Sequence, residues 1–299
     1  MRLRRAYDNR VKGTITIRPM KAADVPGSVG CWREADLDLR RRLHLPAATW
    51  TDELVTWTER RVAFFLATDQ AGSWVADDEG TIVAMAQAHA REGLWVLAHL
   101  FVIPAAQSKG LGGALFRRAV SLVPEDSPGL IMSSPDPRAI RVYAAAGFAL
   151  HPAVAARGRI QDGSVLTVSG IRSGAKSDLD WTASVDRLVR GAGRPADLAL
   201  ALAQGDRILV AEERGYVVFG DSGVTVLAAL DPRTAAHLLA AALATTYDRE
   251  LQVGRITAAQ QWSIPVLLAA GLQIRPQGPV MVRGHPAPLT PYLPDGTLG

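Results

Sequence analysis

The sequence has a single cysteine, Cys31, among its 299 residues. One thiol excludes an intrachain disulfide and any metal site built from several thiolates, and it fits a reducing compartment. The six histidines show no metal-ligand spacing, so no metal is expected. No stretch approaches the roughly 18 apolar residues of a membrane-spanning helix, and no apolar signal-peptide segment follows the basic N-terminus. These features predict a soluble, cytoplasmic protein without a membrane partner.

An excess of charge of one sign is also missing. Lys and Arg number 33 against 29 Asp and Glu, which gives a formal net charge of only +4. Apart from short runs at 2–5 and 40–42, the arginines are scattered, which is typical of a solvated surface. We therefore expect no nucleic-acid partner. Hydrophobic residues make up 48% of the chain. The length of the chain is enough for one or two domains with sizeable cores.

What the chain does contain is an internal repeat. The segment "WVADDEGTIVAMA" (74–86) aligns without a gap with "LVAEERGYVVFGD" (209–221), and each is typical of two strands joined by a tight turn. Gly80 and Gly215 occupy equivalent positions. We expect each of them to supply the positive φ that such a turn needs.

Two further pairs of segments follow in the same order. "AIRVYAAAGFAL" (139–150) matches "SIPVLLAAGLQI" (263–274), and 100–115 falls opposite 228–243, with a proline in each. Because order and spacing agree over three blocks, the sequence predicts two domains of one fold.

Hydrophobic periodicity predicts the elements of the first copy. They are strands at 14–18, 73–77, 81–88, 94–103, 129–133, 148–151 and 164–170, and helices at 22–37, 50–66, 111–123 and 137–146. This order predicts an α/β fold of two tandem domains, each with a mixed, mostly antiparallel sheet flanked by helices. The predicted domains are 14–171 and 196–299, with a linker containing a short helix at 172–195.

A glycine-rich turn joins the strand that ends at Val102 to the helix that begins near Leu111. The N–H groups of residues 108–113 are expected to lie at the positive end of the helix dipole, where glycines at 110 and 112 let an anion approach. The turn thus predicts a phosphate site. It matches neither a dinucleotide fingerprint nor a nucleotide P-loop, because glycine is absent at 115 and Lys109 precedes the glycine. The alternative is a plain strand-to-helix turn.

The pattern V-x-P-x-x-Q-x-x-G-x-G in this turn resembles motif A of the GNAT superfamily of N-acetyltransferases. "RAIRVYAAAGF" (138–148) resembles motif B of that family, and residues 15–36 are similar to its opening strand and first helix. The resemblance covers residues 14 to about 170. A weaker resemblance covers 197–284, so the whole chain resembles the tandem-GNAT proteins.

The resemblance implies acetyl-CoA as co-substrate and no metal. The implied reaction moves acetyl to a primary amine of a small molecule or peptide by direct attack. The strand end would bind the pantetheine and acetyl group, and the turn would hold the pyrophosphate. The implied binding residues are Leu100, Phe101, Val102, Gln107, Ser108, Lys109, Gly110, Leu111, Gly112 and Gly113.

The helix that carries Tyr143 has clear end signals: Asp136 as N-cap, Pro137 at the first helical position and Gly147 just past the end. The family resemblance favours Tyr143 as the acid that protonates the departing CoA thiolate, since a phenol and a thiol have similar pKa values. The alternative is an aromatic anchor in the core. Asp136 stands where many relatives have Asn.

The sequence does not identify a general base. Relatives often carry Glu or His four or six residues before the strand-ending valine, but these positions are Ala98 and Val96 here. His99 is interpreted as a packed or capping histidine. Glu92, in the turn before the strand, would act through a water or be a solvated carboxylate. Asp36 and Asp38, where the first helix ends, would bind a cationic acceptor or face solvent.

The second copy lacks the chemistry of the first. Ala235, Leu238 and Ala240 stand opposite Gln107, Gly110 and Gly112, and Leu267 stands opposite Tyr143. We therefore expect this copy to bind no acetyl-CoA. The proline-rich end of the chain has two interpretations. By analogy with tandem-GNAT aminoglycoside acetyltransferases, Asp295 or a carboxylate at Gly299 would act as the base; alternatively, the segment only packs against a domain.

Two other functions stay open. The missing base would suit a non-catalytic protein that binds or senses acyl-CoA. An acyltransferase using another acyl-CoA, or a thiol-precursor acceptor as in the tandem-GNAT mycothiol synthases, would share the same sequence features.

Overall fold

The computed structural model describes residues 15–160, 170–246, 249–284 and 287–299. The chain divides into two compact units. Unit 1 comprises residues up to 89 together with 97–125, and unit 2 comprises 90–96 and 126–299. Residue 14 and most of the strand predicted at 164–170 lie outside the described residues. The predicted domain boundaries remain a prediction.

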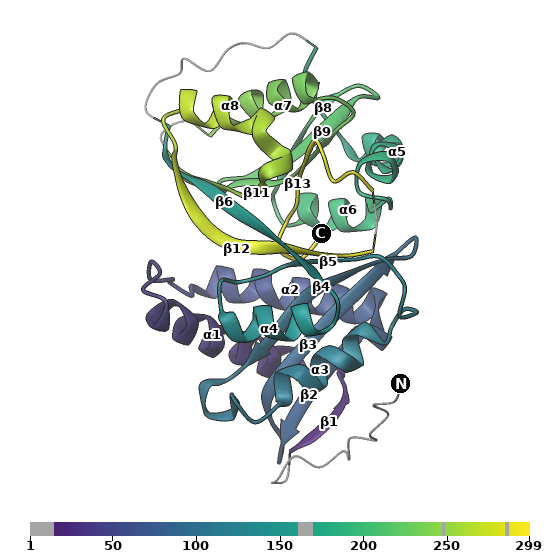
Figure 1. Ribbon diagram of the computed structural model, residues 1–299, viewed down its shortest axis with the longest axis vertical. Coiled ribbons are helices and arrows are strands. Elements are labelled where there is room, and N and C mark those ends of the chain that lie inside the picture. The colour runs from purple at the N-terminus through teal and green to yellow at the C-terminus, as the bar shows by residue number, and fades with distance from the viewer. Residues whose placement is uncertain (1–14, 161–169, 247–248, 285–286) are drawn as a thin grey trace. The chain divides into compact units, whose positions relative to one another are not determined.

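Unit 1 is an antiparallel sheet with helices (Figure 1). Strand β1 pairs with β2 in the register Ile17 to Ala76, and β2 pairs with β3. Its elements are β1 (Thr16–Pro19), η1 (Ala22–Asp24), α1 (Val25–Arg42), α2 (Asp52–Thr68), η2 (Gln70–Gly72), β2 (Ser73–Asp78), β3 (Thr81–Arg91), β4 (Leu94–Val102), η3 (Pro104–Ala106) and α3 (Leu111–Val120). The last residues of β3 and the first residues of β4 are counted in unit 2.

Helix α1 continues to Arg42, five residues beyond its predicted end. Ion pairs at i,i+4 explain the difference: Arg40 Nε lies 2.9 Å from Asp36, and Arg42 Nε lies 2.8 Å from Asp38. Such pairs stabilise a helix, and arginines in its last turn interact favourably with the dipole. The apolar stripes of α1 and α2 enclose the core of unit 1, which contains Met20, Val25, Val29, Cys31, Val62, Val75, Ile82 and Met85.

Unit 2 is a mixed sheet in the order β5-β12-β6-β11-β10-β9-β8-β7, with β13 paired to β10. Its neighbouring strands pair antiparallel except β10 and β11. The strands are β5 (Gly129–Met132), β6 (Ala149–Arg159), β7 (Arg172–Ser173), β8 (Arg207–Ala211), β9 (Gly215–Gly220), β10 (Gly223–Ala229), β11 (Glu250–Thr257), β12 (Gln273–Arg283) and β13 (Tyr292–Leu293). The helices are α4 (Pro137–Ala145), η4 (Lys176–Asp178), α5 (Leu179–Val189), α6 (Pro195–Ala203), α7 (Pro232–Ala244), η5 (Ala258–Ser263) and α8 (Ile264–Ala269). The predicted α/β fold class is confirmed.

The two copies exchange strands in unit 2 (Figure 1). Strand β12 of the second copy lies between β5 and β6 of the first, with Met281 opposite Ile131 and Ile274 opposite Ala156. In return, β6 pairs along its other edge with β11 of the second copy. Each copy therefore completes the sheet of the other.

This exchange also explains why the strand predicted at 148–151 runs to Arg159. Its partners are two strands that lie about a hundred residues further along the chain. Hydrogen bonds on both edges extend the strand, whereas its own sequence carries no clear alternation.

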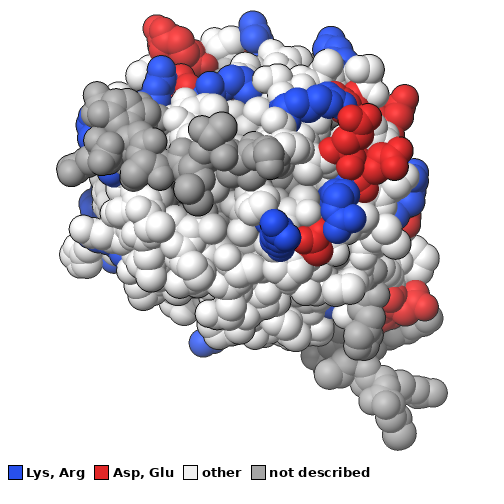
Figure 2. Space-filling view, turned by 90° about the horizontal axis from the view of Figure 1, so that it is seen from above, with Lys and Arg blue, Asp and Glu red and all other residues white. Residues whose placement is uncertain are grey.

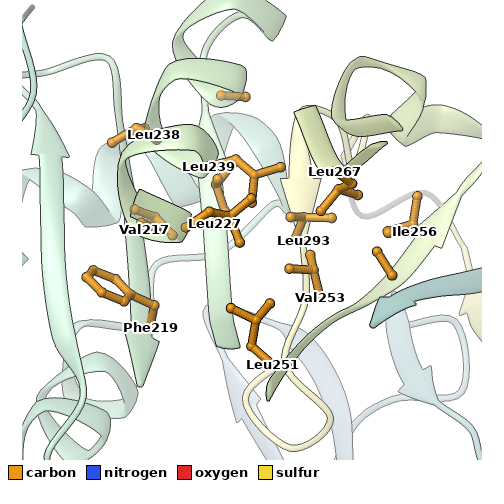
Figure 3. Packing of buried hydrophobic residues seen from close by; sticks show 14 of the residues in the cluster. Val217, Phe219, Leu227, Leu238, Leu239, Leu251, Val253, Ile256, Leu267 and Leu293 are labelled. Carbon is orange, nitrogen blue, oxygen red and sulfur yellow. The ribbon is translucent and has the colours of Figure 1, made fainter. Parts of the chain in front are cut away.

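The core of the second copy is continuous (Figure 3). Leu238 and Leu239 of α7 cover Val217 and Leu227 of the sheet, and all four side chains are fully buried. Residues from β11, α8 and β13 complete the cluster: Leu251, Val253, Ile256, Leu267 and Leu293. This side of the second copy is thus filled with packed aliphatic side chains.

The two hairpin glycines differ in what they do. Gly80 has φ 92° in its turn, as predicted. The prediction for Gly215 was wrong, because the left-handed residue of that turn is Glu213, with φ 56°. Gly215 begins β9 and pairs with Ala229, whose Cβ would lie 2.7 Å from a Cβ at 215. Close approach of the next strand, rather than the turn, therefore requires glycine there.

Unit 2 contains a buried polar network. Some of its residues lie in the interval 172–195, and the others lie further along the chain. Asp186 and Arg194 are fully buried and 3.1 Å apart. The Tyr216 hydroxyl donates to Asp186 at 2.7 Å, and Arg194 donates to the Tyr292 hydroxyl at 2.9 Å. Burial raises the pKa of Tyr216, which keeps this donor protonated. Since a buried ion pair needs such partners, the network joins α5, β9 and β13.

Charged side chains of both signs are interspersed on the face shown in Figure 2. Blue Lys and Arg residues lie beside red Asp and Glu residues there, separated by uncharged surface. Over the described parts of the chain, no helix combines the length and apolar character needed to cross a membrane.

Candidate functional site

The turn before α3 presents open backbone in unit 1. Gly110 is the N-cap residue, with φ 83°, and has no side chain to cap the helix. The first helical hydrogen bond runs from Ala114 N to Gly110 O at 3.0 Å. The N–H groups of the preceding helical residues therefore lie at the positive end of the helix dipole.

The space around the glycines is open. A Cβ at Gly110 would meet nothing within 4 Å, and one at Gly112 would meet only Val102 Cγ2, at 3.6 Å. Gly112 lies inside the helix, where glycine costs about 1 kcal/mol relative to alanine. Crowding within the described chain does not account for this glycine, whereas a ligand resting on the backbone would.

Gln107 connects this turn to the strand before it. Its side-chain Nε2 donates to the carbonyl of Val102 at 2.9 Å. Leu111 is buried, so only its backbone faces the turn, while Ser108 and Lys109 are exposed. Unit 1 therefore brings together all ten residues that the resemblance implied for acyl-CoA binding, including Leu100 and Phe101 at the end of β4.

Tyr143 lies in unit 2, on α4. The predicted end signals of this helix are present: the Asp136 carboxylate accepts from Arg138 N at 3.0 Å, and Gly147 has φ 83°. Only 5% of Tyr143 is exposed. Burial raises the pKa of its hydroxyl, and the nearby Asp136 carboxylate adds to the effect. The phenol therefore holds its proton at neutral pH, and its pKa lies further above that of a thiol than the sequence alone indicated.

The candidate bases are engaged in structural contacts. In unit 2, Glu92 accepts from Arg187 at 2.7 Å and from the Gly193 N–H at 3.0 Å, and the hydrogen bond from Arg187 lowers its pKa. In unit 1, the Nδ1 of buried His99 lies 2.9 Å from Gln87 Oε1. The Gln87 amide nitrogen donates to Val62 O at 3.0 Å, so its oxygen faces His99 and Nδ1 carries the proton.

Asp36 and Asp38 are likewise paired. Arg40 holds Asp36, and Arg41 and Arg42 hold Asp38 at 2.6 and 2.8 Å. Hydrogen bonds from Arg42 and Arg41 lower the pKa of Asp38. These carboxylates brace the end of α1, and neither is an unpaired anion that would attract a cationic acceptor.

The second copy has no counterpart of the glycine turn. Helix α7 begins at Pro232, so Ala235, Leu238 and Ala240 lie inside the helix and not at its start. These three residues therefore do not occupy the structural positions of Gln107, Gly110 and Gly112, although the sequences align. The turn itself is replaced by a longer helix, and Leu238 and Leu267 belong to the core.

The N-terminus of α7 instead carries its own anion. The Asp231 carboxylate accepts from the Thr234 N–H at 2.9 Å. Although burial opposes ionisation, hydrogen bonds from Thr234 and Arg214 lower the pKa of Asp231 to about 2. Sequence analysis missed this cap, although Asp231-Pro232 repeats the Asp-Pro signal that identified the start of α4.

The last described segment is packed within unit 2. Tyr292 and Leu293 form β13, and Leu298 is fully buried. Asp295 accepts hydrogen bonds from the N–H groups of Thr297 and Leu298 at 2.8 and 2.9 Å, which closes a turn. Arg194 donates to the carbonyl of Gly299. Deleting this segment would remove core residues, so it would not test the segment for a catalytic base.

Cys31 is buried against β4, with its Sγ 3.9 Å from the carbonyl of Phe101. Burial raises the pKa of its thiol to about 12. A protonated, buried thiol is a poor nucleophile. Within the described ranges, no three His, Cys, Asp or Glu side chains are arranged to hold a metal ion.

Residues 41–148 match the acetyltransferase (GNAT) family. The fold is similar to that of a putative acetyltransferase from Pyrococcus horikoshii, with TM-score 0.77 and 16% identity over 99% of this chain and 100% of that chain. It is also similar to a GCN5-related N-acetyltransferase from Sphaerobacter thermophilus (TM-score 0.59, 12% identity, 92% and 98% covered). A tandem GNAT protein from the clavulanic acid biosynthesis pathway has TM-score 0.53 and 16% identity, with 90% and 98% covered. No curated protein matches the sequence significantly.

Proposed function

We propose that this chain, an acyltransferase that carries a GNAT-family domain over residues 41–148, moves acetyl from acetyl-CoA to a primary amine. The observation that carries the proposal is the start of α3. Its N-cap is Gly110, and a Cβ on Gly112 would find open space except for Val102. Backbone N–H groups there would hold the pyrophosphate, with the exposed Lys109 adding positive charge.

The end of β4 supports a role in binding the acetyl group. The Ile103 N–H donates to Val83 O of β3 at 3.0 Å. Because successive residues of a strand direct their N–H groups to opposite edges, the N–H of Val102 points away from β3. In the proposed reaction it stabilises the oxyanion that forms on the thioester carbonyl.

The proposed reaction is a direct attack. The neutral amine nitrogen forms a bond to the carbonyl carbon, and the carbon–sulfur bond breaks. The nitrogen loses one proton, and the thiolate gains one from the Tyr143 hydroxyl, so the products are the amide and free CoA thiol. The unreactive Cys31 favours this route over one through an acyl-cysteine.

Release of free CoA thiol tests the proposal directly. With acetyl-CoA and a panel of primary amines, thiol should appear only when both are present. The rival is an acyl-CoA sensor. A sensor would show acetyl-CoA binding in calorimetry but would release no thiol with any amine. A second panel of acyl-CoA esters of increasing length tests whether acetyl is the preferred group.

One acetyl-CoA should bind per chain. The first copy offers an uncapped helix start, whereas the Asp231 carboxylate occupies that position in the second copy and would repel a pyrophosphate. Calorimetric titration should therefore give a stoichiometry of one. A tight stoichiometry of two would contradict the assignment of the second copy as inactive.

Replacing Tyr143 with Phe should lower kcat by roughly 100-fold, the range expected for loss of a general acid. The ring stays in place, so the KM for acetyl-CoA and the midpoint of thermal unfolding should change little. Steady-state kinetics and calorimetric unfolding measure these quantities. A variant as fast as wild type would make Tyr143 a core residue, and an equal loss of stability would make its role structural.

A further inference from the structure

Three partly buried aromatic side chains lie together in unit 1. The rings of Trp32 and Phe101 stack with centroids 4.8 Å apart and planes at 15°. Trp50 meets Trp32 edge-on, with centroids 6.0 Å apart. All three pack against the core of unit 1 without being closed off inside it. We call Trp32, Trp50 and Phe101 the aromatic platform.

The platform adjoins the strand end to which the proposed function assigns the acetyl group. Phe101 and Val102 are consecutive on β4, so their side chains point to opposite faces of the strand. The Phe101 ring contacts Trp32 of α1, whereas Val102 faces Gly112 of α3. A molecule on the platform would therefore lie across β4 from the pyrophosphate turn, beside the position proposed for the thioester.

Neighbouring side chains hold two members of the platform, Trp32 and Trp50, in place. The His99 ring packs 4.5 Å from Trp32, and its Nδ1 is hydrogen bonded to Gln87. The Trp50 Nε1–H donates to the Asp36 carboxylate at 3.2 Å. Aromatic surfaces fixed in advance bind flat ligands at a low entropic cost.

Charges of both signs lie beside the platform. Asp36, one turn from Trp32, is held by Arg40, and Asp38 is held by Arg41 and Arg42. Three guanidinium groups thus accompany two carboxylates at this end of α1. Asp52 and Glu53 follow Trp50 in the first turn of α2, so the charges near the platform are mixed and the aromatic rings decide the class of acceptor.

We propose that the acceptor is an amine that carries an aromatic ring, an arylalkylamine, whose ring rests on the platform. This inference rests on the proposed acetyl transfer. Ring binding places the amine nitrogen at the end of β4, where it forms the bond to the acetyl carbon as the thioester bond breaks. One proton leaves the nitrogen, and one joins the CoA sulfur.

An amine panel tests the proposal on the full-length protein. The amines are 2-phenylethylamine, its saturated analogue 2-cyclohexylethylamine, propylamine and spermidine, each assayed by thiol release from acetyl-CoA. The kcat/KM for 2-phenylethylamine should exceed that for propylamine and for spermidine at least tenfold, and should exceed that for the saturated analogue. Equal or better use of spermidine or propylamine would overturn the inference and leave the proposed function intact.

Matched variants locate the effect. In Trp32→Leu and Trp50→Leu, the ratio of kcat/KM for 2-phenylethylamine to that for propylamine should fall tenfold. In Trp74→Leu, a partly buried tryptophan on β2 near Arg118, it should not change. Trp50→Phe should keep most of the ratio, which guards against a variant that fails to fold. A ratio unchanged in both platform variants would refute the platform.

A binding measurement separates this inference from the proposed function. Calorimetric titration with 2-phenylethylamine in the presence of CoA measures binding of the amine without turnover. Suppose that this binding is lost in Trp50→Leu and kept in Trp74→Leu, but that no amine causes thiol release from acetyl-CoA. That result would support the ligand class and refute the transfer. An absence of both binding and turnover with 2-phenylethylamine would overturn the inference.

Discussion

Replacing Gly112 with Glu is expected to abolish acetyl-CoA binding, with a loss of affinity of roughly 100-fold or more, about 2.7 kcal/mol. The new carboxylate would lie at the start of α3, where the backbone N–H groups are proposed to hold the pyrophosphate. It would compete for those donors and repel the phosphates. Isothermal titration with acetyl-CoA measures the effect.

Two further variants control for helix damage. Gly112→Ala adds a Cβ that meets only Val102, at 3.6 Å, so the fold should be kept and the affinity should fall less. Gly30→Glu adds the same carboxylate to α1, at a position where a Cβ meets nothing within 4 Å, and should bind acetyl-CoA normally. Unchanged affinity in Gly112→Glu would refute the site.

Expression of residues 1–171 alone should yield no folded protein. In that fragment, β5 would lose its partner β12, and β6 would lose both β12 and β11. The side chains of Ala156 and Ile160 would also lose the core of the second copy. Unpaired strand edges and exposed apolar surface drive aggregation. Solubility and far-ultraviolet circular dichroism of the purified fragment test the expectation.

Co-expression of 1–171 with 172–299 is the matched control. Together the two pieces contain every residue of the chain, and only one peptide bond is missing. Because β6 and β12 lie side by side, the two pieces should purify together as a folded complex. A soluble, folded 1–171 fragment would contradict the strand exchange and would indicate two independent domains.

The sequence predicted the features that depend on neighbouring residues. The turn at Gly80, the glycine turn before α3 and the end signals of α4 all follow from local conformational preferences, and the structure contains each of them. The fold class followed from the order of elements. The match of residues 41–148 to the acetyltransferase family agrees with the resemblance drawn from motifs A and B.

The features that the sequence did not reveal depend on distant partners. The role of Gly215 is set by Ala229 on the adjacent strand, and the length of β6 by β11 and β12. The aromatic platform joins residues from α1, from the segment before α2, and from β4. No periodicity within one segment reports such an assembly. The capping Asp231 is different, since its Asp-Pro signal is local and was available.

The exchange of strands also bears on how the chain folds while it is being synthesised. Strand β12 begins about 110 residues after β6 ends. At typical rates of about 5–20 residues per second, β6 would wait roughly 6 to 23 s for β12 to leave the ribosome, and β5 would wait longer. During that interval their edges are open, at the stage when pairing with another nascent chain is easiest. The half of the chain that has lost the glycine turn therefore determines when the other half can finish folding.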